Sequence, residues 1–371
     1  MKPKILFIMH MPPPVHGAAM VGQYIHDSKL INEKFDCHYI NLTTAKSLQD
    51  IGKGGVRKLF KFLELLVKIV KSVITVKPSL VYVTPNACGG AFYKDFIVVQ
   101  LLKVLRCKIV VHYHNKGVST RQNKRLDNWL YSRFFRNIKV ILLAEILYQD
   151  VKKYVKREDV YICPNGIPVT LQNEPIAERH NKIPHILFLS NLIVSKGVLV
   201  LLDALKKLKD KGYSFVCDFV GGETDEIDAN RFNDEVVKRG LNQCVIYHGK
   251  KYGNDKKEYF EKADIFTFPT FYHNETFGLV NLEAMEHKLP VVSTNEGGIP
   301  DVVVNGENGL ISKKGNTDSL AQCISELLDD KELRIKMGEA GYKKFIENFT
   351  LPAFEEKFAD SMTEIVNSGG G

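Results

Sequence analysis

Short apolar runs alternate with longer amphipathic segments along the whole chain. Five runs rich in Val, Ile and Leu occupy the first half, at residues 5–9, 38–42, 80–84, 109–113 and 140–144. Five more occupy the second half, at residues 186–189, 215–220, 245–247, 265–268 and 290–293. Segments of helical length separate the runs. This alternation predicts β-α-β units, in which the strands form parallel sheets.

The alternation is interrupted once, by a polar and irregular segment at residues 169–182. A chain of 371 residues is long for one core and comfortable for two. We therefore predict an α/β protein with two Rossmann-like, doubly wound domains that face a central cleft, at residues 1–168 and 183–348. Residues 169–182 are the expected linker. Residues 349–371 are expected to form a helix that crosses back to the first domain, followed by a flexible tail.

The net charge of +8 is divided unequally between the two halves of the chain. Residues 1–170 hold 27 Lys and Arg against 11 Asp and Glu, a balance of +16, and the remainder carries −8. A basic first half predicts an anionic partner, for which membrane headgroups, nucleic acid and polyphosphates are all candidates.

Cysteine usage and the apolar stretches bear on location. The seven cysteines are scattered and never form a Cys-x-x-Cys pair, which favours reduced thiols in the cytoplasm. The apolar run near the amino terminus is too short for a signal peptide. The longest apolar stretch, residues 59–76, contains Lys61, Glu64, Lys68 and Lys71, so an ordinary transmembrane helix is not expected there.

Two glutamates stand eight positions apart in "HNETFGLVNLEAMEHKLPVVSTNEGG", residues 273–298. The apolar spacing predicts a helix that begins beside Glu275 with Asn274 or Thr276 as its N-cap. Eight residues of helix would separate Glu275 from Glu283 by about 12 Å. Carboxylate pairs of glycosidases lie roughly 5 to 10 Å apart. The two glutamates therefore suit the anchoring of one elongated ligand better than acid–base catalysis, the alternative being that both are solvated.

The predicted start of this helix is a candidate anion site. The free backbone N–H groups would be those of Phe277, Gly278 and Leu279, where a diphosphate is favoured, and glycine permits its close approach.

Residues 263–311, "ADIFTFPTFYHNETFGLVNLEAMEHKLPVVSTNEGGIPDVVVNGENGLI", strongly resemble the donor-binding signature of retaining GT-B glycosyltransferases of family four. "PNGIP" at residues 164–168 resembles the interdomain segment of that family. "ILFLSNLIVSKGVLVLLDAL" at residues 186–205 resembles the first strand and helix of its second domain. The resemblance is dense in the second half of the chain and loose in the first, and it implies the GT-B fold.

The resemblance implies roles for individual residues. Glu275 would contact hydroxyls of the transferred sugar, and Glu283 the ribose hydroxyls of the nucleotide. Lys196 matches the lysine whose charge stabilises the departing diphosphate. The remaining donor-binding positions that it implies are Thr276, Phe277, Gly278 and Leu279, with backbone contacts to the sugar and the diphosphate from the last three.

The sequence departs from the family at Ser190-Asn191-Leu192, where the family commonly has Gly-Arg-Leu. Ser190 and Asn191 stay candidate donor-binding residues, but the second cation on the diphosphate is missing. Three outcomes are open: Lys196 and the helix start suffice, a basic residue from elsewhere compensates, or activity is weakened.

Two residues of the first half also match the family. Gly17, in "HMPPPVHGAAMVG", follows the first strand and resembles the loop that reaches the donor phosphate, although an ordinary strand-to-helix turn is the alternative. His114 follows the fourth strand, where the family places a histidine near the reacting sugar. His112 lies two positions earlier, so the two side chains would point to the same face of the sheet. One of the two is expected to be structural. The resemblance thus implies Glu275, His114 and Lys196 as the catalytic residues.

No Asp-x-Asp after a strand, Gly-x-Gly-x-x-Gly or Walker loop occurs, so no metal or cofactor is expected and metal-independent transfer is favoured.

Two basic segments, residues 57–77 and 121–139, interleave Lys and Arg with apolar and aromatic residues. They are typical of peripheral contact with an anionic membrane, or of helices packed on the sheet with a solvated basic face. No nucleic-acid-binding module accompanies them, and nucleic acid is not an expected partner.

The resemblance implies a retaining glycosyltransferase that moves a hexose or N-acetylhexosamine from a nucleoside-diphosphate sugar, by family frequency a UDP-sugar. The expected acceptor is a sugar, such as a lipid-linked oligosaccharide of a bacterial surface polysaccharide like O-antigen or capsule. The expected location is the cytoplasm, at the inner face of the plasma membrane. Two alternatives stay open: a sugar-nucleotide hydrolase or epimerase on the same scaffold, and a non-catalytic nucleotide-sugar-binding partner.

Overall fold

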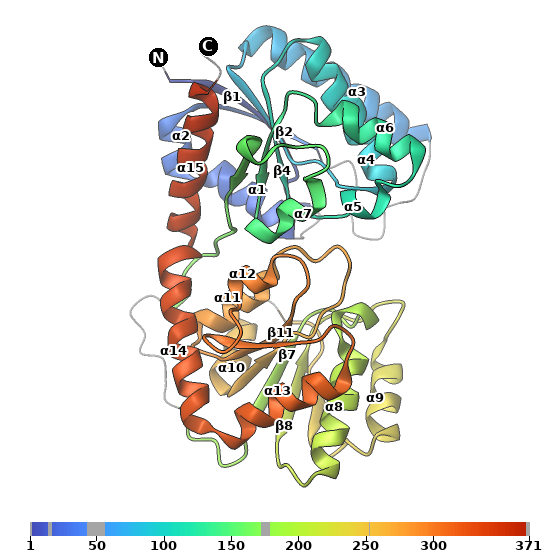
Figure 1. The fold of residues 1–371 in the computed structure, drawn as a ribbon, viewed down its shortest axis with the longest axis vertical. Coiled ribbons are helices and arrows are strands. Elements are labelled where there is room, and N and C mark those ends of the chain that lie inside the picture. The colour runs from blue at the N-terminus through green and yellow to red at the C-terminus, as the bar shows by residue number, and fades with distance from the viewer. Residues whose placement is uncertain (1, 14–16, 43–55, 172–178, 252, 369–371) are drawn as a thin grey trace. The chain divides into compact units, whose positions relative to one another are not determined.

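The computed structural model describes the chain except for residues 1, 14–16, 43–55, 172–178, 252 and 369–371 (Figure 1). The chain divides into two compact units. The first unit combines Met1–Gly166 with Leu351–Gly371, and the second unit is Ile167–Thr350.

The first unit contains a parallel six-stranded sheet in the order β2-β1-β3-β4-β5-β6. Its strands are β1 (Lys4–Met9), β2 (Asp36–Asn41), β3 (Leu80–Val83), β4 (Ile109–Tyr113), β5 (Lys139–Leu142) and β6 (Val160–Ile162). Its helices are α1 (Gly17–Asp27), α2 (Lys29–Lys34), α3 (Val56–Val76), α4 (Gly89–Val104), α5 (Val118–Arg121), α6 (Arg125–Phe134), α7 (Tyr148–Val151) and α15 (Leu351–Asn367). The central strands β3 and β4 are buried along their whole length because helices cover both faces of the sheet.

The last helix of the chain completes the core of the first unit. Phe354 and Phe358 of α15 are buried together with Phe7 and Tyr82 of the sheet, and the Phe358 ring meets the Tyr82 ring edge-on at 5.3 Å. Figure 1 shows α3, α4 and α6 gathered on the side of the sheet away from α2 and α15.

The second unit contains another parallel six-stranded sheet, in the order β12-β11-β10-β7-β8-β9. Its strands are β7 (His185–Leu189), β8 (Val216–Val220), β9 (Val245–Tyr247), β10 (Ile265–Thr267), β11 (Val291–Thr294) and β12 (Gly309–Ser312). Its helices are α8 (Val198–Asp210), α9 (Ala229–Lys238), α10 (Asn254–Lys262), α11 (Leu279–Glu286), α12 (Ile299–Val302), α13 (Thr317–Asp329) and α14 (Lys331–Asn348). Strand order breaks between β7 and β10, and the segments that follow these two strands carry most of the predicted site.

The predicted two-domain Rossmann-like α/β fold is confirmed, and each of the ten predicted runs overlaps a strand. The sequence interpretation missed β6 and β12. Both are short edge strands; β12 begins at a glycine and directly follows a turn at residues 306–308. All seven cysteines are free thiols. Among the helices of the described residues, none combines the length and the apolar character that a bilayer crossing requires.

Candidate active site

The loop that follows β7 brings Lys196 against the segment that follows β10. A short 3₁₀ turn, Val194–Lys196, is followed by Gly197 with φ +91°. A β-carbon at Gly197 would collide with the carbonyl oxygen of Pro269. The Phe271 amide donates to the Ser195 carbonyl at 2.8 Å. Only a glycine allows this close packing at this backbone conformation, and the packing fixes the position of Lys196.

Lys196 and Glu275 form an ion pair, although 79 positions separate them in sequence. Their side chains are 16% and 13% exposed. The Lys196 ammonium also lies 4.7 Å from the ring centre of Tyr272 and 5.3 Å from that of Phe268. Aromatic faces attract cations, so the lysine is held between a carboxylate and two rings. The structure thus brings together two of the three residues that were expected to be catalytic.

The segment before α11 is a loop, and the predicted helix start was wrong. The helix begins at Leu279, and its N-cap is Gly278 in the left-handed conformation, φ +68° and ψ +67°. Neither Asn274 nor Thr276 caps the helix. The amides left without a helical partner therefore begin at Leu279, not at Phe277. Because Glu275 stands in the loop, the 12 Å separation expected from continuous helix does not apply to the two glutamates.

The loop after β11 holds this segment in place. The Gly298 amide donates to the Thr276 carbonyl at 2.7 Å. Gly297 has φ +56°, and a β-carbon there would collide with the Glu275 carbonyl oxygen. The Phe277 side chain is buried and meets the Phe349 ring edge-on at 5.8 Å. The loop after β11 and the Phe349 ring therefore hold the backbone around Glu275 in place.

Glu283, in the middle of α11, is also paired with a lysine. Its carboxylate accepts from the Lys256 ammonium at 2.6 Å, and both side chains are about one quarter exposed. Lys256 lies in α10, which the sequence interpretation did not include in the site. Each of the two glutamates that were expected to bind ligand hydroxyls is therefore paired with a lysine of the same unit.

Asn191 lies beside the loop that follows β8. Its side-chain oxygen accepts from the Gly222 amide at 3.3 Å. The position of a β-carbon on Gly222 lies 3.1 Å from that oxygen and 3.4 Å from Cδ of Lys250. The Lys250 side chain thus runs close to Asn191. Ser190 donates its own amide to the Val220 carbonyl at 3.0 Å, which continues the sheet pairing past the strand end.

The sequence interpretation also missed Asn281, one turn into α11. Its side chain is fully buried, and neither its nitrogen nor its oxygen has a hydrogen-bond partner among the described residues. It lies against Gly278, because a β-carbon there would be 2.7 Å from its amide nitrogen. Buried side-chain amides are normally hydrogen-bonded. Asn281 is therefore an exception, and it lies beside Gly278 at the start of α11.

Two predicted residues belong to the first unit. His114 follows β4 and is half-buried, with its ring 4.2 Å from that of His112. His112 is fully buried, its Nδ1 shares a hydrogen bond of 2.8 Å with the Tyr82 hydroxyl, and burial lowers its pKa well below the usual range. The lowered pKa favours the neutral form of His112, whose ring is enclosed in the first unit. Gly17 is exposed and begins α1.

The comparison with family models identifies the second unit. Residues 170–344 match the model of glycosyl transferases group 1. This match covers most of the second unit and a little less than half of the chain. The recognition of a GT-B glycosyltransferase of the bacterial polysaccharide kind is confirmed.

Curated relatives extend the match beyond the family model. The chain is 29% identical over 184 residues to the capsular polysaccharide biosynthesis glycosyltransferase CapM of Staphylococcus aureus, which covers 48% of this chain and 47% of CapM. The chain thus spans about half the length of that relative. It is 24% identical over 275 residues to O-antigen chain mannosyltransferase C of Escherichia coli, covering 70% of each chain. These names place the group 1 relatives in polysaccharide biosynthesis.

A solved structure has the same fold. Anabaena HepE, determined in complex with UDP, matches with a TM-score of 0.74 and 17% identity, covering 97% of this chain and all of that chain. The same protein was also determined with UDP-glucose. At this identity the likeness establishes the fold of this chain.

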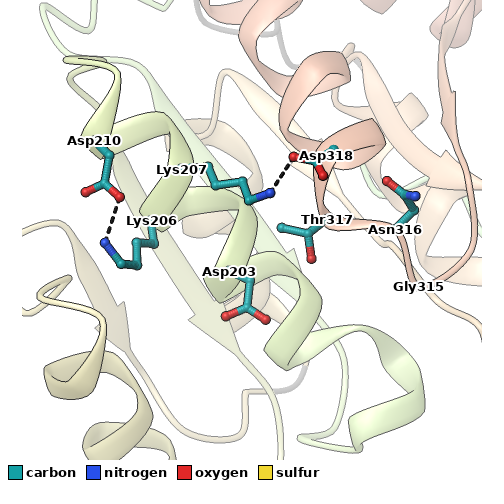
Figure 2. Close-up of a pocket in the computed structure, with 8 residues that line it drawn as sticks. All are labelled: Asp203, Lys206, Lys207, Asp210, Gly315, Asn316, Thr317 and Asp318. Carbon is teal, nitrogen blue, oxygen red and sulfur yellow. Dashed lines mark hydrogen bonds and ion pairs between the residues drawn. The ribbon is translucent and has the colours of Figure 1, made fainter.

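The pocket drawn in Figure 2 is separate from these residues. It lies between α8 and the start of α13, and it contains none of the predicted site residues. Its lysines are paired with aspartates, Lys206 with Asp210 at 2.6 Å and Lys207 with Asp318. Its charges are thus largely compensated within the protein.

Within the part of the chain that the structure describes, no three His, Cys, Asp or Glu side chains are grouped to hold a metal ion.

Proposed function

We propose that this chain transfers a hexose or N-acetylhexosamine from a UDP-sugar to a sugar acceptor with retention of configuration. The observation that carries the proposal is the Lys196–Glu275 pair beside the start of α11, with Glu283 further along the same helix. A cation, a carboxylate and free helix amides together offer partners for a diphosphate and for sugar hydroxyls. The UDP and UDP-glucose complexes of HepE support a UDP-sugar donor.

Donor binding would exchange the internal ion pair for contacts to the ligand. Diphosphate oxygens compete with Glu275 for the Lys196 ammonium, because phosphate and carboxylate are alternative acceptors of the same charge-assisted hydrogen bond. Glu275 is then released to accept from hydroxyls of the transferred sugar. Glu283 acts in the same way on the ribose hydroxyls once Lys256 turns toward the nucleotide. Thr276, Phe277, Gly278 and Leu279 supply the backbone around the sugar and the diphosphate.

Lys250 is our candidate for the missing second cation. Asn191 stands where the family resemblance places an arginine, and the Lys250 side chain runs beside it from the loop after β9. An ammonium on a flexible stem can reach a diphosphate that an arginine at position 191 would otherwise contact. Ser190 and Asn191 then contribute hydrogen bonds without charge.

The chemical step needs charge stabilisation more than an enzymatic nucleophile. The acceptor hydroxyl oxygen forms a bond to C1 of the sugar, and the bond from C1 to the diphosphate oxygen breaks on the same face. The departing diphosphate oxygen takes the acceptor proton. Lys196, Lys250 and the α11 start stabilise the negative charge that develops on the leaving group, so the protein's own groups can support transfer without a metal. In the first unit, His114 would bind sugar or acceptor and Gly17 would admit the donor phosphate.

The names of the relatives support a surface polysaccharide as the product, so we propose a lipid-linked oligosaccharide as the acceptor. Such an acceptor would place the enzyme at the cytoplasmic face of the membrane. Its identity can be sought by mass analysis of products from candidate acceptors, after a thermal-shift panel of UDP- and GDP-sugars has chosen the donor.

The test of the proposed function compares Glu275→Ala with Asp318→Ala, a surface carboxylate of the same unit that also pairs with a lysine. With donor and acceptor present, we expect Glu275→Ala to lower kcat at least about 100-fold, the scale of losing one transition-state contact, and Asp318→Ala to leave it unchanged. UDP should bind the Glu275→Ala variant at least as tightly as the wild type. Unchanged turnover would exclude the proposed role of Glu275. UDP release at equal rates with and without acceptor would indicate a hydrolase, and an isomerised donor would indicate an epimerase.

A further inference from the structure

An exposed apolar surface follows the long helix α3 of the first unit. We name as the apolar stripe its five large hydrophobic residues that face solvent: Leu59, Phe60, Leu63, Val67 and Ile74. These side chains are between 48% and 68% exposed. Single exposed hydrophobic residues are normal, but five on one helix form a patch of the kind that marks an interaction surface.

Helical geometry places the apolar stripe on the side of α3 that points away from the sheet. At about 100° per residue, the five side chains fall within roughly 100° of the helix circumference. Leu65 and Ile69 lie on the opposite side, and both are buried. The side of α3 that packs on the first unit is therefore the side of Leu65 and Ile69. The residues of the apolar stripe do not contribute to the core of that unit.

A row of lysines borders the apolar stripe. Lys61, Lys68 and Lys71 fall within the next roughly 100° of the helix circumference. Lys68 and Lys71 are exposed, and Lys61 is half-buried. The helix has five basic residues and one acidic residue, Glu64. An apolar surface with a basic edge combines the two attractions that hold a helix in the plane of an anionic membrane.

Helix α6, on the same side of the first-unit sheet as α3, also combines exposed apolar residues with a basic side chain. In α6, Leu126 is 61% and Trp129 is 53% exposed. The Arg133 guanidinium lies over the Trp129 ring, 5.1 Å from its centre. Tryptophan beside a basic side chain is typical of a membrane interface, where the ring sits at the level of the headgroups. Figure 1 shows α3 and α6 on one side of the first-unit sheet.

We propose that the apolar stripe docks the first unit on a bilayer that contains anionic lipid, with α3 lying in the interface. The charge of the chain favours this occupant over a second copy, because residues 1–170 carry a balance of +16 and two such surfaces would repel each other. The proposal rests on α3 and not on the donor site, and it goes beyond the proposed function. If both hold, docking brings the enzyme to an acceptor that is carried by lipid.

The test measures binding of the full chain to vesicles of phosphatidylcholine with and without phosphatidylglycerol. The variant Val67→Glu/Ile74→Glu charges the apolar stripe. The matched control is Val237→Glu/Ile335→Glu in the second unit, whose two side chains are 66% and 56% exposed. We expect the stripe variant to bind at least about 30-fold more weakly, from the lost burial of two aliphatic side chains, and the control to bind like the wild type. Each of the single variants Lys68→Gln and Lys71→Gln should bind about fivefold more weakly than the wild type.

Three outcomes would overturn the proposal: equal binding by the stripe and control variants, binding that does not depend on phosphatidylglycerol, or a wild-type dimer in light scattering that the stripe variant converts to monomer. The last would identify a second copy as the occupant. Transfer to a water-soluble acceptor should be unchanged in the stripe variant. Loss of vesicle binding with intact transfer therefore separates this proposal from the proposed function.

Discussion

The Lys196–Glu275 pair predicts opposite effects of one substitution on stability and on nucleotide binding. In Glu275→Gln the shape of the side chain is kept and its charge is removed. The paired side chains are 16% and 13% exposed, between the surface pairs that contribute about 0–1 kcal/mol and the buried pairs whose disruption costs about 3–5 kcal/mol. We therefore expect the free energy of unfolding to fall by about 2 kcal/mol. For a unit of this size, that lowers Tm by about 4 to 8 °C.

The same substitution should strengthen UDP binding. If diphosphate binds Lys196 as proposed, it displaces Glu275 in the wild type, and the glutamine removes that competitor. About 1 kcal/mol of released competition corresponds to roughly fivefold tighter binding. Calorimetry of unfolding and isothermal titration with UDP measure the two effects. Asp318→Asn, which breaks the more exposed Lys207 pair, should change neither by more than a few tenths of a kcal/mol. Weaker UDP binding by Glu275→Gln, or unchanged stability, would refute this reasoning.

Three further substitutions test the supports of the site. Gly197→Ala should cost at least about 2 kcal/mol because its β-carbon meets the Pro269 carbonyl, whereas Gly212→Ala, also at positive φ but in open space, should cost about 1 kcal/mol; equal losses in urea unfolding would contradict this. His112 has a lowered pKa in the folded protein, so stability is lost as pH falls below about 6.5, where the unfolded chain takes up a proton that the folded protein excludes. Between pH 7 and 5.5 the His112→Gln variant should lose about 1 kcal/mol less than the wild type, and parallel pH profiles would exclude this. Asn281→Leu, which removes a buried unpaired amide, should stabilise the protein by about 1 to 3 kcal/mol, and a lower Tm would show that the amide has a partner.

The sequence predicted the fold well because the central strands of a parallel sheet are apolar on both faces. Such strands read as continuous runs, and all ten runs overlap strands. The edge strands β6 and β12 are only three and four residues long and were missed. The start of α11 was placed too early because Asn274 and Thr276 are good caps in sequence. The loop after β11 holds the segment before Gly278 in a non-helical conformation, and that contact is not visible in a local pattern.

The site was predictable in its residues and not in its pairings. Family resemblance implied Lys196, Glu275 and Glu283, and their places in the donor site stay predictions. That each glutamate is held by a lysine depends on loops and helices brought together by the sheet, across separations of 79 and 27 positions. The closeness of Lys250 to Asn191 has the same origin. No spacing rule connects residues from three different strand ends, so only the folded structure could show these neighbours.

The return of α15 to the first unit has a consequence for the order of events during synthesis. Phe354 and Phe358 fill the core around Phe7 and Tyr82, so the first unit lacks part of its interior until the final helix has left the ribosome. At about 5 to 20 residues per second, the second unit is made and can fold during the tens of seconds that separate the two parts of the first. The half of the chain that is translated first should therefore be the last to become protease-resistant.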